Sequence, residues 1–395
     1  MNRNVTLVLV DRTGGILGAL PSFEVELPWW QEASDVVEAA RLKHGVTVTL
    51  LRLLAADRPA PPGGEVVYLA QAHGEISVAL DPFESVTAVG PADLAPEPRR
   101  APWAVPGGPA ASLAWALEAL GPGDAVAVQQ RTWNLSALWR IEMAGSPVAW
   151  LKQVPWFFAH EPAVLRLVDG VAPGLVPEVL AVGEAGRSLL AHVPGEDRYG
   201  SGAELCAVVA RDFHRVQAEF AGRTEELLAA GVPDRRRESD RFARVAEPWL
   251  ETVGGLTDLM DELPARLAAI EACGVPDTLV HGDLHGGNVR TTATSRVIVD
   301  WGDSVVGHPA FDILRLTDGL PEQPQLLAEW AARWRESVPG CDPETALALF
   351  RPVAALHSAA IYQDFLDHIE PSERPYHESD VPDRLRAAVA AVGTS

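Results

Sequence analysis

The chain has 395 residues, a hydrophobic content of 47% and a formal net charge of −22. A single hydrophobic core seldom grows beyond about 250 to 300 residues, so this length predicts more than one compact unit. The strong negative charge argues against a nucleic-acid or anionic-membrane partner, because like charges repel. The three cysteines have neither zinc-site nor disulfide-framework spacing, and the apolar run at 5–10 is too short for a signal peptide or membrane span, so we expect a cytoplasmic protein.

Residues 1–90 alternate between strand and helix signals. Apolar runs at 6–10 and 16–20 flank a Gly-containing turn and predict a hairpin. A helix is expected from Trp29 to about Lys43, where Gly45 ends it. Further strands are expected at 46–54 and 66–71. We therefore predict a small α/β or α+β domain at 1–90.

The order strand, hairpin, helix, Gly, strand resembles a Nudix domain. In that family the helix carries metal-binding carboxylates in an Arg-Glu-x-x-Glu-Glu-x-Gly run. With that Gly aligned on Gly45, the charged positions hold Glu38, Ala39, Leu42 and Lys43, and neither Ala nor Leu can coordinate a hard cation. The resemblance implies the fold without the hydrolase, and an unrelated small α/β cap explains the pattern equally well.

Proline, alanine and glycine dominate residues 91–111. Proline lacks a backbone N–H and resists regular hydrogen-bonded structure, so we predict a linker with the domain boundary inside it. Beyond it, strands are expected at 125–130, 137–142 and 148–152. The turn at 131–136 contains Ser136, which could contact phosphate, although a plain hairpin loop explains the turn equally well.

Two charged residues follow in an order that matters for nucleotide binding. Lys152 ends the third of these strands, and Glu161 opens a helix whose first turn contains Pro162. A strand at 188–195 comes next, and after it apolar residues at helical spacing predict a core helix at 205–220. These elements describe a small sheet followed by a helical region.

The most informative stretch is His-Gly-Asp-Leu-His-Gly-Gly-Asn at 281–288, followed by an apolar strand that leads to Asp300. Four residues separate Asp283 from Asn288. This layout is typical of metal-assisted phosphoryl transfer, in which an Asp accepts a hydroxyl proton and an Asn and a second Asp hold Mg²⁺. We therefore expect Asp283, Asn288 and Asp300 to be catalytic, with Asn288 and Asp300 as metal ligands.

At these residues the chain resembles the aminoglycoside phosphotransferase and choline kinase group of small-molecule kinases. Gly282 stands where protein kinases usually carry Arg, which favours a small acceptor over a protein. The run at 307–313 resembles the family's GDPAYDL segment, so the resemblance implies that Asp312 braces the catalytic loop. The resemblance to this kinase group covers about residues 120–385.

The resemblance implies an α+β, bilobal protein-kinase-like fold, with a small lobe and hinge at 112–195 and a helical large lobe at 196–395. It also implies ATP as co-substrate and Mg²⁺ as cofactor. Lys152, held by Glu161, would bind the nucleotide phosphates, and backbone groups at Ala191 and Val193 would contact the adenine.

The phosphate acceptor would bind near the base, among the C-terminal helices. Asp364 and Asp367 are three residues apart and share a helical face. Tyr362 could add aromatic surface for an ammonium group or a sugar face. Two carboxylates would suit an amine-bearing acceptor such as an aminoglycoside, amino sugar or amino alcohol, although a solvated acidic helix explains them equally well. Asp303 and His285 are further candidates for acceptor or phosphoryl contacts.

Two other functions remain open on the sequence. The chain could be a pseudokinase or nucleotide sensor whose N-terminal domain serves as a partner surface. It could also hold a working hydrolase in that domain, which the missing carboxylates disfavour. The oligomeric state and the preference between ATP and GTP cannot be read from the sequence.

Overall fold

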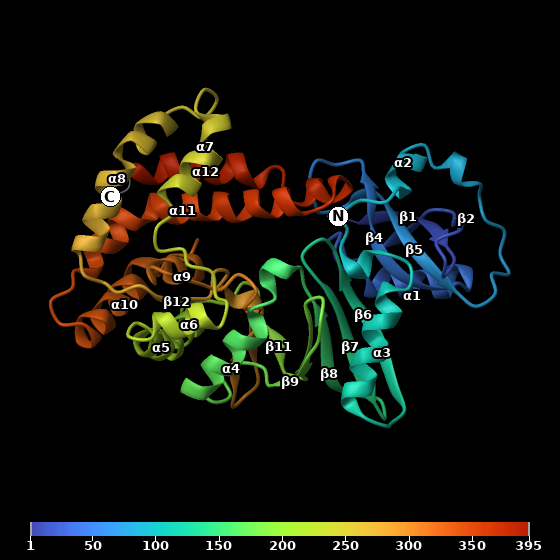
Figure 1. Cartoon of the computed structure of the whole chain (residues 1–395), viewed down its shortest axis with the longest axis horizontal. Coiled ribbons are helices and arrows are strands. Elements are labelled where there is room, and N and C mark those ends of the chain that lie inside the picture. Colours follow the sequence, from blue (N-terminus) through green and yellow to red (C-terminus); the bar gives the residue numbers. More distant parts are fainter. Residues whose placement is uncertain (1, 394–395) are drawn as a thin grey trace. The chain divides into compact units, whose positions relative to one another are not determined.

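The computed structural model describes residues 2–393, and the chain divides into two compact units. The sheet unit comprises 1–159, 179–192 and 364–379, and the helical unit comprises 160–178, 193–363 and 380–395. Figure 1 shows most of the labelled strands in the first unit and most of the labelled helices in the second, which confirms the α+β class predicted from the sequence. Each unit is described by itself.

The sheet unit begins with a five-stranded sheet of order β2-β1-β5-β4, in which β3 also pairs with β1. β1 runs parallel to β5, with Arg3 opposite Gly64 and Val10 opposite Gln71. The hairpin of β1 and β2 and the strands at β4 and β5 agree with the sequence prediction. The bounds are β1 (Arg3–Val10), β2 (Ile16–Ala19), β3 (Phe23–Val25), β4 (Thr47–Ala56) and β5 (Gly64–His73).

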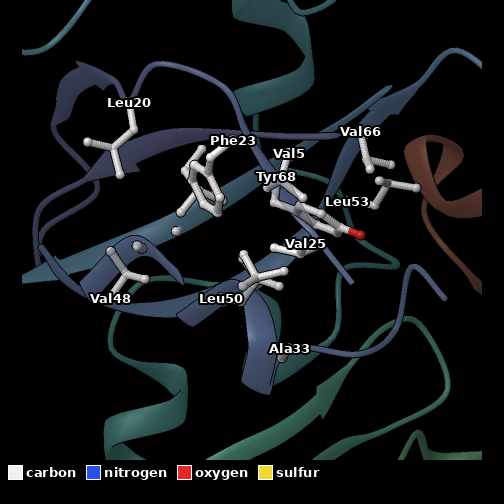
Figure 2. Close-up of a cluster of buried hydrophobic side chains, with 14 of the residues drawn as sticks. Val5, Leu20, Phe23, Val25, Ala33, Val48, Leu50, Leu53, Val66 and Tyr68 are labelled. Atoms are coloured by element: carbon white, nitrogen blue, oxygen red, sulfur yellow. The ribbon is translucent and has the colours of Figure 1, made fainter. Parts of the chain in front are cut away.

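Both faces of this sheet are buried, and successive side chains of β1 point to opposite faces. Val5, Leu7 and Leu9 belong to one apolar cluster, whereas Val8 and Val10 belong to another. This separation follows from the two-residue period of a strand. The first cluster, drawn in Figure 2, also includes side chains of α1 (Ser34–His44), and it therefore fixes the helix against the sheet.

The sequence predicted that this helix begins at Trp29. In the structure α1 begins at Ser34. Trp30 is fully buried, and its indole N–H donates to the carbonyl of Gly63 at 2.8 Å. This long-range contact holds the segment before α1 in an irregular conformation. The predicted end of the helix is confirmed, because Gly45 caps it with a left-handed φ of 68°.

A second five-stranded sheet, of order β6-β7-β8-β10-β9, is antiparallel throughout. Trp103, Trp139 and Leu151 are buried in its core, against which α3 packs. The strands predicted around 125–152 are confirmed. The bounds are β6 (Ala125–Thr132), β7 (Ala137–Met143), β8 (Ser146–Gln153), β9 (Val179–Val182), β10 (Arg187–Ala191) and α3 (Gly108–Leu120).

Residues 91–111 contain more regular structure than the sequence predicted. A single-turn helix, α2 (Pro91–Leu94), opens the segment, a 3-10 turn occupies Pro102–Ala104, and α3 already begins at Gly108. Proline is tolerated in the first turn of a helix, where its missing N–H would have no partner. The proposed domain boundary inside this segment stays a prediction.

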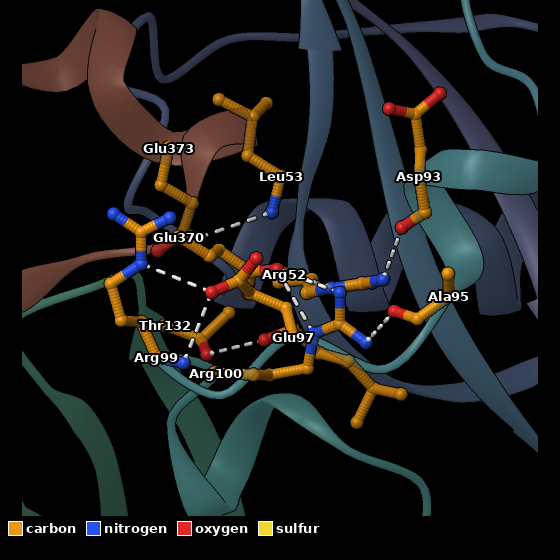
Figure 3. A network of polar contacts seen from close by, with 11 residues as sticks. Arg52, Leu53, Asp93, Ala95, Glu97, Arg99, Arg100, Thr132, Glu370 and Glu373 are labelled. Carbon is orange, nitrogen blue, oxygen red and sulfur yellow. Dashed lines mark hydrogen bonds and ion pairs between the residues drawn. The ribbon is translucent and has the colours of Figure 1, made fainter.

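A buried polar cluster fixes the segment 364–379 onto β4 within the sheet unit (Figure 3). Glu370 accepts hydrogen bonds from Arg52 Nε at 3.3 Å and from Arg100 Nε at 2.9 Å. Glu373 accepts one from the Leu53 amide at 3.3 Å, and burial raises the pKa of Glu373 to about 8. Because Arg52 and Glu370 are 1% and 4% exposed, removing Glu370 would leave the buried charge of Arg52 without its partner.

The helical unit is built from long helices and two small sheets, β11-β13-β14 and β12-β15. The predicted core helix is confirmed as α5, which buries Val209, Phe213, Val216 and Phe220. Its helices are α4 (Glu161–Val171), α5 (Ala203–Phe220), α6 (Thr224–Ala229), α7 (Ser239–Ala246), α8 (Leu256–Ala272), α9 (Ala310–Leu316), α10 (Gln323–Ser337), most of α11 (Pro343–His368) and α12 (Asp380–Val392). Its strands are β11 (Glu196–Asp197), β12 (Thr278–Val280), β13 (Val289–Thr291), β14 (Arg296–Ile298) and β15 (Val305–Gly307).

Among residues 2–393, α11 is the one helix that is long and apolar enough to cross a membrane. Half of its apolar window is buried inside the structure, as in the core helices of globular proteins.

Candidate active site

The loop at 281–288 lies entirely in the helical unit, between β12 and β13. β12 ends at Val280, a 3-10 turn covers Gly286–Asn288, and β13 starts at the next residue. The Val299 amide donates to the Asn288 carbonyl at 2.9 Å, which brings the segment before Asp300 alongside the loop. The order of residues predicted from the sequence therefore becomes a spatial cluster.

Asp283 is surrounded by donors within this cluster. Arg315 of α9 approaches its Oδ1 with Nε at 3.0 Å and Nη2 at 2.9 Å. On the other oxygen, Oδ2, His285 Nε2 lies at 3.2 Å and Asn288 Nδ2 donates at 3.2 Å. Burial raises the pKa of Asp283, but the His285 hydrogen bond and the Arg315 charge outweigh it and hold this pKa below its usual value. The group is therefore a carboxylate at neutral pH.

Asp312 accepts three hydrogen bonds, two of which come from the loop and hold it in place. The amides of His281 and Gly282 donate to its two oxygens at 2.9 and 3.1 Å, and Gln217 Nε2 donates at 3.0 Å. Asp312 is 2% exposed, and its burial raises its pKa to about 7. This geometry confirms the interpretation of Asp312 as a brace.

Gly282 is required by close packing as well as by its backbone conformation. Its φ is +89°, and a Cβ at this position would lie 2.1 Å from the Asp303 carbonyl oxygen. Any side chain here would displace either the loop or the turn that carries Asp303. The Asp303 side chain is half-buried. The Asp303 backbone lies directly against Gly282 of the loop.

His281 is a fully buried structural residue of the loop. Its Nε2 lies 3.0 Å from the Val299 carbonyl, and its Nδ1 accepts from the Asp283 amide at 3.3 Å. Burial lowers the pKa of His281 to about 4. The ring is therefore neutral and links the loop to the strand that precedes Asp300.

Asp300 is exposed and adopts a left-handed backbone with φ of +64°. A residue with a side chain pays about 1 to 2 kcal/mol for this conformation, so the surroundings must impose it. Glu161 does so by accepting a hydrogen bond from the Trp301 amide at 2.9 Å, while the buried Trp301 indole donates to the Ile298 carbonyl. Glu161 thereby fixes the turn directly after Asp300.

The donor set around Asp300 and Asn288 suits Mg²⁺. Asn288 uses its Nδ2 atom to donate to Asp283, so its amide oxygen is the atom left for a cation. Mg²⁺ is commonly bound by one or two protein oxygens and completes its shell with phosphates and water. Within residues 2–393, no group of three or more His, Cys, Asp or Glu side chains could hold a metal by itself.

Other predicted nucleotide residues lie in the sheet unit. Lys152 is buried on β8 opposite Ser188, and Ser136 Oγ accepts from the Trp133 indole at 3.0 Å. Ala191 ends β10, whereas Val193 belongs to the helical unit, where its carbonyl accepts from Arg290 at 3.1 Å. The pairing of Lys152 with Glu161 stays a prediction.

The predicted acceptor residues are divided between the units. Tyr362 lies in the helical unit, with the Arg384 guanidinium 5.9 Å from its ring centre, and burial raises the pKa of Tyr362. Asp364 and Asp367 lie in the sheet unit, on the last turns of α11. The acceptor role of these residues stays a prediction.

Sequence reasoning missed Arg315. The signal was present, because Arg315 follows Asp312 by three residues on α9 and so lies near the same helical face. Its partner, Asp283, is 32 positions away in the chain, so the sequence alone did not connect them.

The antiparallel β6–β10 sheet and the helix-rich unit with the loop of Asp283 have the architecture of the protein-kinase-like fold. Residues 156–350 match the model of the phosphotransferase enzyme family (APH). The resemblance predicted from the catalytic loop is thereby confirmed, whereas the Nudix-like resemblance of residues 1–90 is not shown.

Two solved structures illustrate the similarity. A candidate aminoglycoside phosphotransferase from Ralstonia eutropha is 19% identical, with 72% of this chain and 98% of that chain covered at a TM-score of 0.51. A choline/ethanolamine kinase family protein from Mesorhizobium loti is 16% identical, with 73% and 99% covered at a TM-score of 0.50. At such low identity these similarities show the fold alone. None of the curated proteins matches this sequence.

Proposed function

We propose that the chain is an ATP-dependent kinase that transfers the γ-phosphate to a hydroxyl of a small molecule. The observation that carries the proposal is the environment of Asp283, a carboxylate with donors on both oxygens in a loop that Asp312 holds rigidly. Phosphoryl transfer depends mainly on positioning and charge neutralisation, and a fixed carboxylate supplies the first of these.

In the proposed reaction, Asp283 accepts a hydrogen bond from the acceptor hydroxyl and aligns its oxygen with the γ-phosphorus. A new P–O bond forms to the acceptor while the bond to the leaving ADP breaks, and the hydroxyl proton passes to Asp283. The lowered pKa of Asp283 makes it a weak base, so orientation is its larger contribution.

Asn288 and Asp300 would hold Mg²⁺, which when bound neutralises charge on the phosphate oxygens. Glu161 supports this role by fixing the turn after Asp300. Lys152 is proposed to contact the nucleotide phosphates, with Ser136, Ala191 and Val193 as further nucleotide contacts. We propose an amine-bearing acceptor, for which the net charge of −22 offers general electrostatic support.

The test is a phosphate-transfer screen of amino sugars, amino alcohols and neutral sugars, with products identified by mass spectrometry. Asp283→Asn should lower turnover of an identified acceptor by at least about a hundredfold, the usual contribution of a positioned base, while nucleotide binding survives. Wild-type turnover by Asp283→Asn would disprove the mechanism. Tight nucleotide binding without any transfer would favour the nucleotide-sensor alternative.

A further inference from the structure

A cavity of about 1200 Å³ lies within the helical unit. It is lined by 234–239, by α7 and α8, by the turn at 274–277 and by parts of β12, β15, α9 and α11. Among the described residues, Asp283, Asn288, Asp300 and Arg315 are not part of its lining. Its volume is somewhat above the roughly 300 to 1000 Å³ of typical small-molecule sites, so it has room for a small organic ligand. Nothing in the proposed phosphate transfer uses it.

Much of the cavity wall is apolar. α8 contributes Leu267 and Ile270, α11 contributes Phe350 and Val353, and Phe311 adds a further ring. Such a wall favours a ligand with an apolar body, because contact removes apolar surface of both from water. Aromatic rings also attract a cation near their faces.

Asp277 stands out among the polar residues of the wall. It is half-buried in the turn between α8 and β12, and its carboxylate forms no hydrogen bond or ion pair with another described residue. Arg236 acts on it electrostatically but is already bound in two places to Asp234, at 2.7 and 2.9 Å. A partly desolvated carboxylate of this kind gains most from a cationic ligand that brings its own hydrogen bonds.

One other carboxylate at the wall is compensated internally. Glu238 is buried and binds both His357 Nδ1 and Arg241. It therefore offers no free charge to a ligand. The Nε2 atoms of His308 and His357 are buried without a hydrogen-bond partner, which distinguishes this wall from a purely apolar packing gap.

We propose that this cavity binds a small organic amine with an apolar body. The ammonium group pairs with Asp277, and the apolar part contacts Leu267, Phe350 and Val353. Arg237, which is exposed and lines the same cavity, would instead favour an anion, so the sign of the ligand charge is the decisive property. The chain's net charge of −22 favours the cation.

The test is isothermal titration calorimetry of the full chain with three probes of similar shape: phenylbutylamine, phenylbutanol and phenylbutyrate. We expect the amine to bind at least tenfold more tightly than the alcohol or the carboxylate. Asp277→Asn should weaken amine binding about tenfold, or about 1.4 kcal/mol, and leave alcohol binding unchanged. Glu251→Gln, an exposed carboxylate outside the cavity lining, is the matched control and should change neither.

A second variant separates this cavity from the proposed acceptor site. Asp283→Asn should retain amine binding, because Asp283 does not line the cavity. Loss of binding in Asp283→Asn but not in Asp277→Asn would assign the amine to the acceptor site and overturn the proposal. Equal affinity for amine and alcohol, tightest binding of the carboxylate, or no binding of any probe would overturn it as well.

Discussion

Replacing Arg315 by Gln tests whether this guanidinium sets the ionisation of Asp283. Arg315 contacts a single carboxylate oxygen through two nitrogen atoms, at 2.9 and 3.0 Å. Such contacts lower the pKa of an acid because they stabilise its charged form. Removing the cation should therefore raise the pKa of Asp283 and move the loss of activity at low pH toward higher pH.

The size of the shift follows from charge separation and exposure. Two unit charges about 4 Å apart interact by about 4 kcal/mol where the effective dielectric constant is about 20. The side chains of Arg315 and Asp283 are 39% and 37% exposed, so solvent screening reduces the net interaction to about 1 kcal/mol. One pKa unit corresponds to about 1.4 kcal/mol, so we expect a rise of roughly one unit.

The assay is kcat/KM as a function of pH for wild type, Arg315→Gln and Arg315→Lys, with an acceptor found by the screen. In Arg315→Gln the acid limb should move upward by roughly one pH unit, while His285 and Asn288 still keep Asp283 ionised near neutral pH. Arg315→Lys retains the charge and should keep the acid limb in place, with a lower kcat from the lost two-point contact. An unshifted acid limb in Arg315→Gln would refute the electrostatic role.

Three further predictions concern stability, measured by chemical or thermal unfolding. Gly282→Ala should cost about 2 kcal/mol or more and impair transfer, because a Cβ would lie 2.1 Å from the Asp303 carbonyl oxygen; unchanged stability would contradict the tight packing. Asp312→Ala should cost about 2 to 4 kcal/mol by orphaning two buried amides, whereas Asp312→Asn, which keeps an acceptor, should cost less. Glu370→Gln should lower the free energy of unfolding by about 3 to 5 kcal/mol, because Arg52 stays buried without a counter-charge. The control Glu97→Gln removes an ion pair with Arg99 that is more exposed, and it should lower the free energy of unfolding by about 1 kcal/mol or less.

The parts of the molecule that the sequence predicted are those whose signals are local. The apolar run of β1 and the helical spacing of α5 depend on neighbours within a few residues, so both elements were predicted near their observed bounds. The brace at Asp312 was implied by the resemblance of the run at 307–313 to the GDPAYDL segment of the kinase family. A residue pattern over a short stretch was sufficient in each case.

The parts that were missed depend on contacts between distant segments. Arg52 and Glu370 are 318 positions apart, and no composition or spacing links them before the chain folds. The start of α1 was predicted five residues too early for the same reason. The Trp30 indole donates a hydrogen bond to the carbonyl of Gly63, which is distant in the chain. The cavity beside Asp277 is likewise invisible in the sequence, because its wall comes from segments far apart in the chain.

The tight packing at Gly282 also affects how the loop at 281–288 is held in position. In protein kinases an Arg at this position typically reaches a phosphorylated loop, whereas here a side chain would collide with the backbone of Asp303. Two amides of the loop are instead held by Asp312, a buried residue of the same unit. The geometry of Asp283 therefore depends on internal hydrogen bonds and requires no added phosphate. Protein that has been treated with a phosphatase should accordingly transfer phosphate at the untreated rate, and a loss of activity after that treatment would contradict this reasoning.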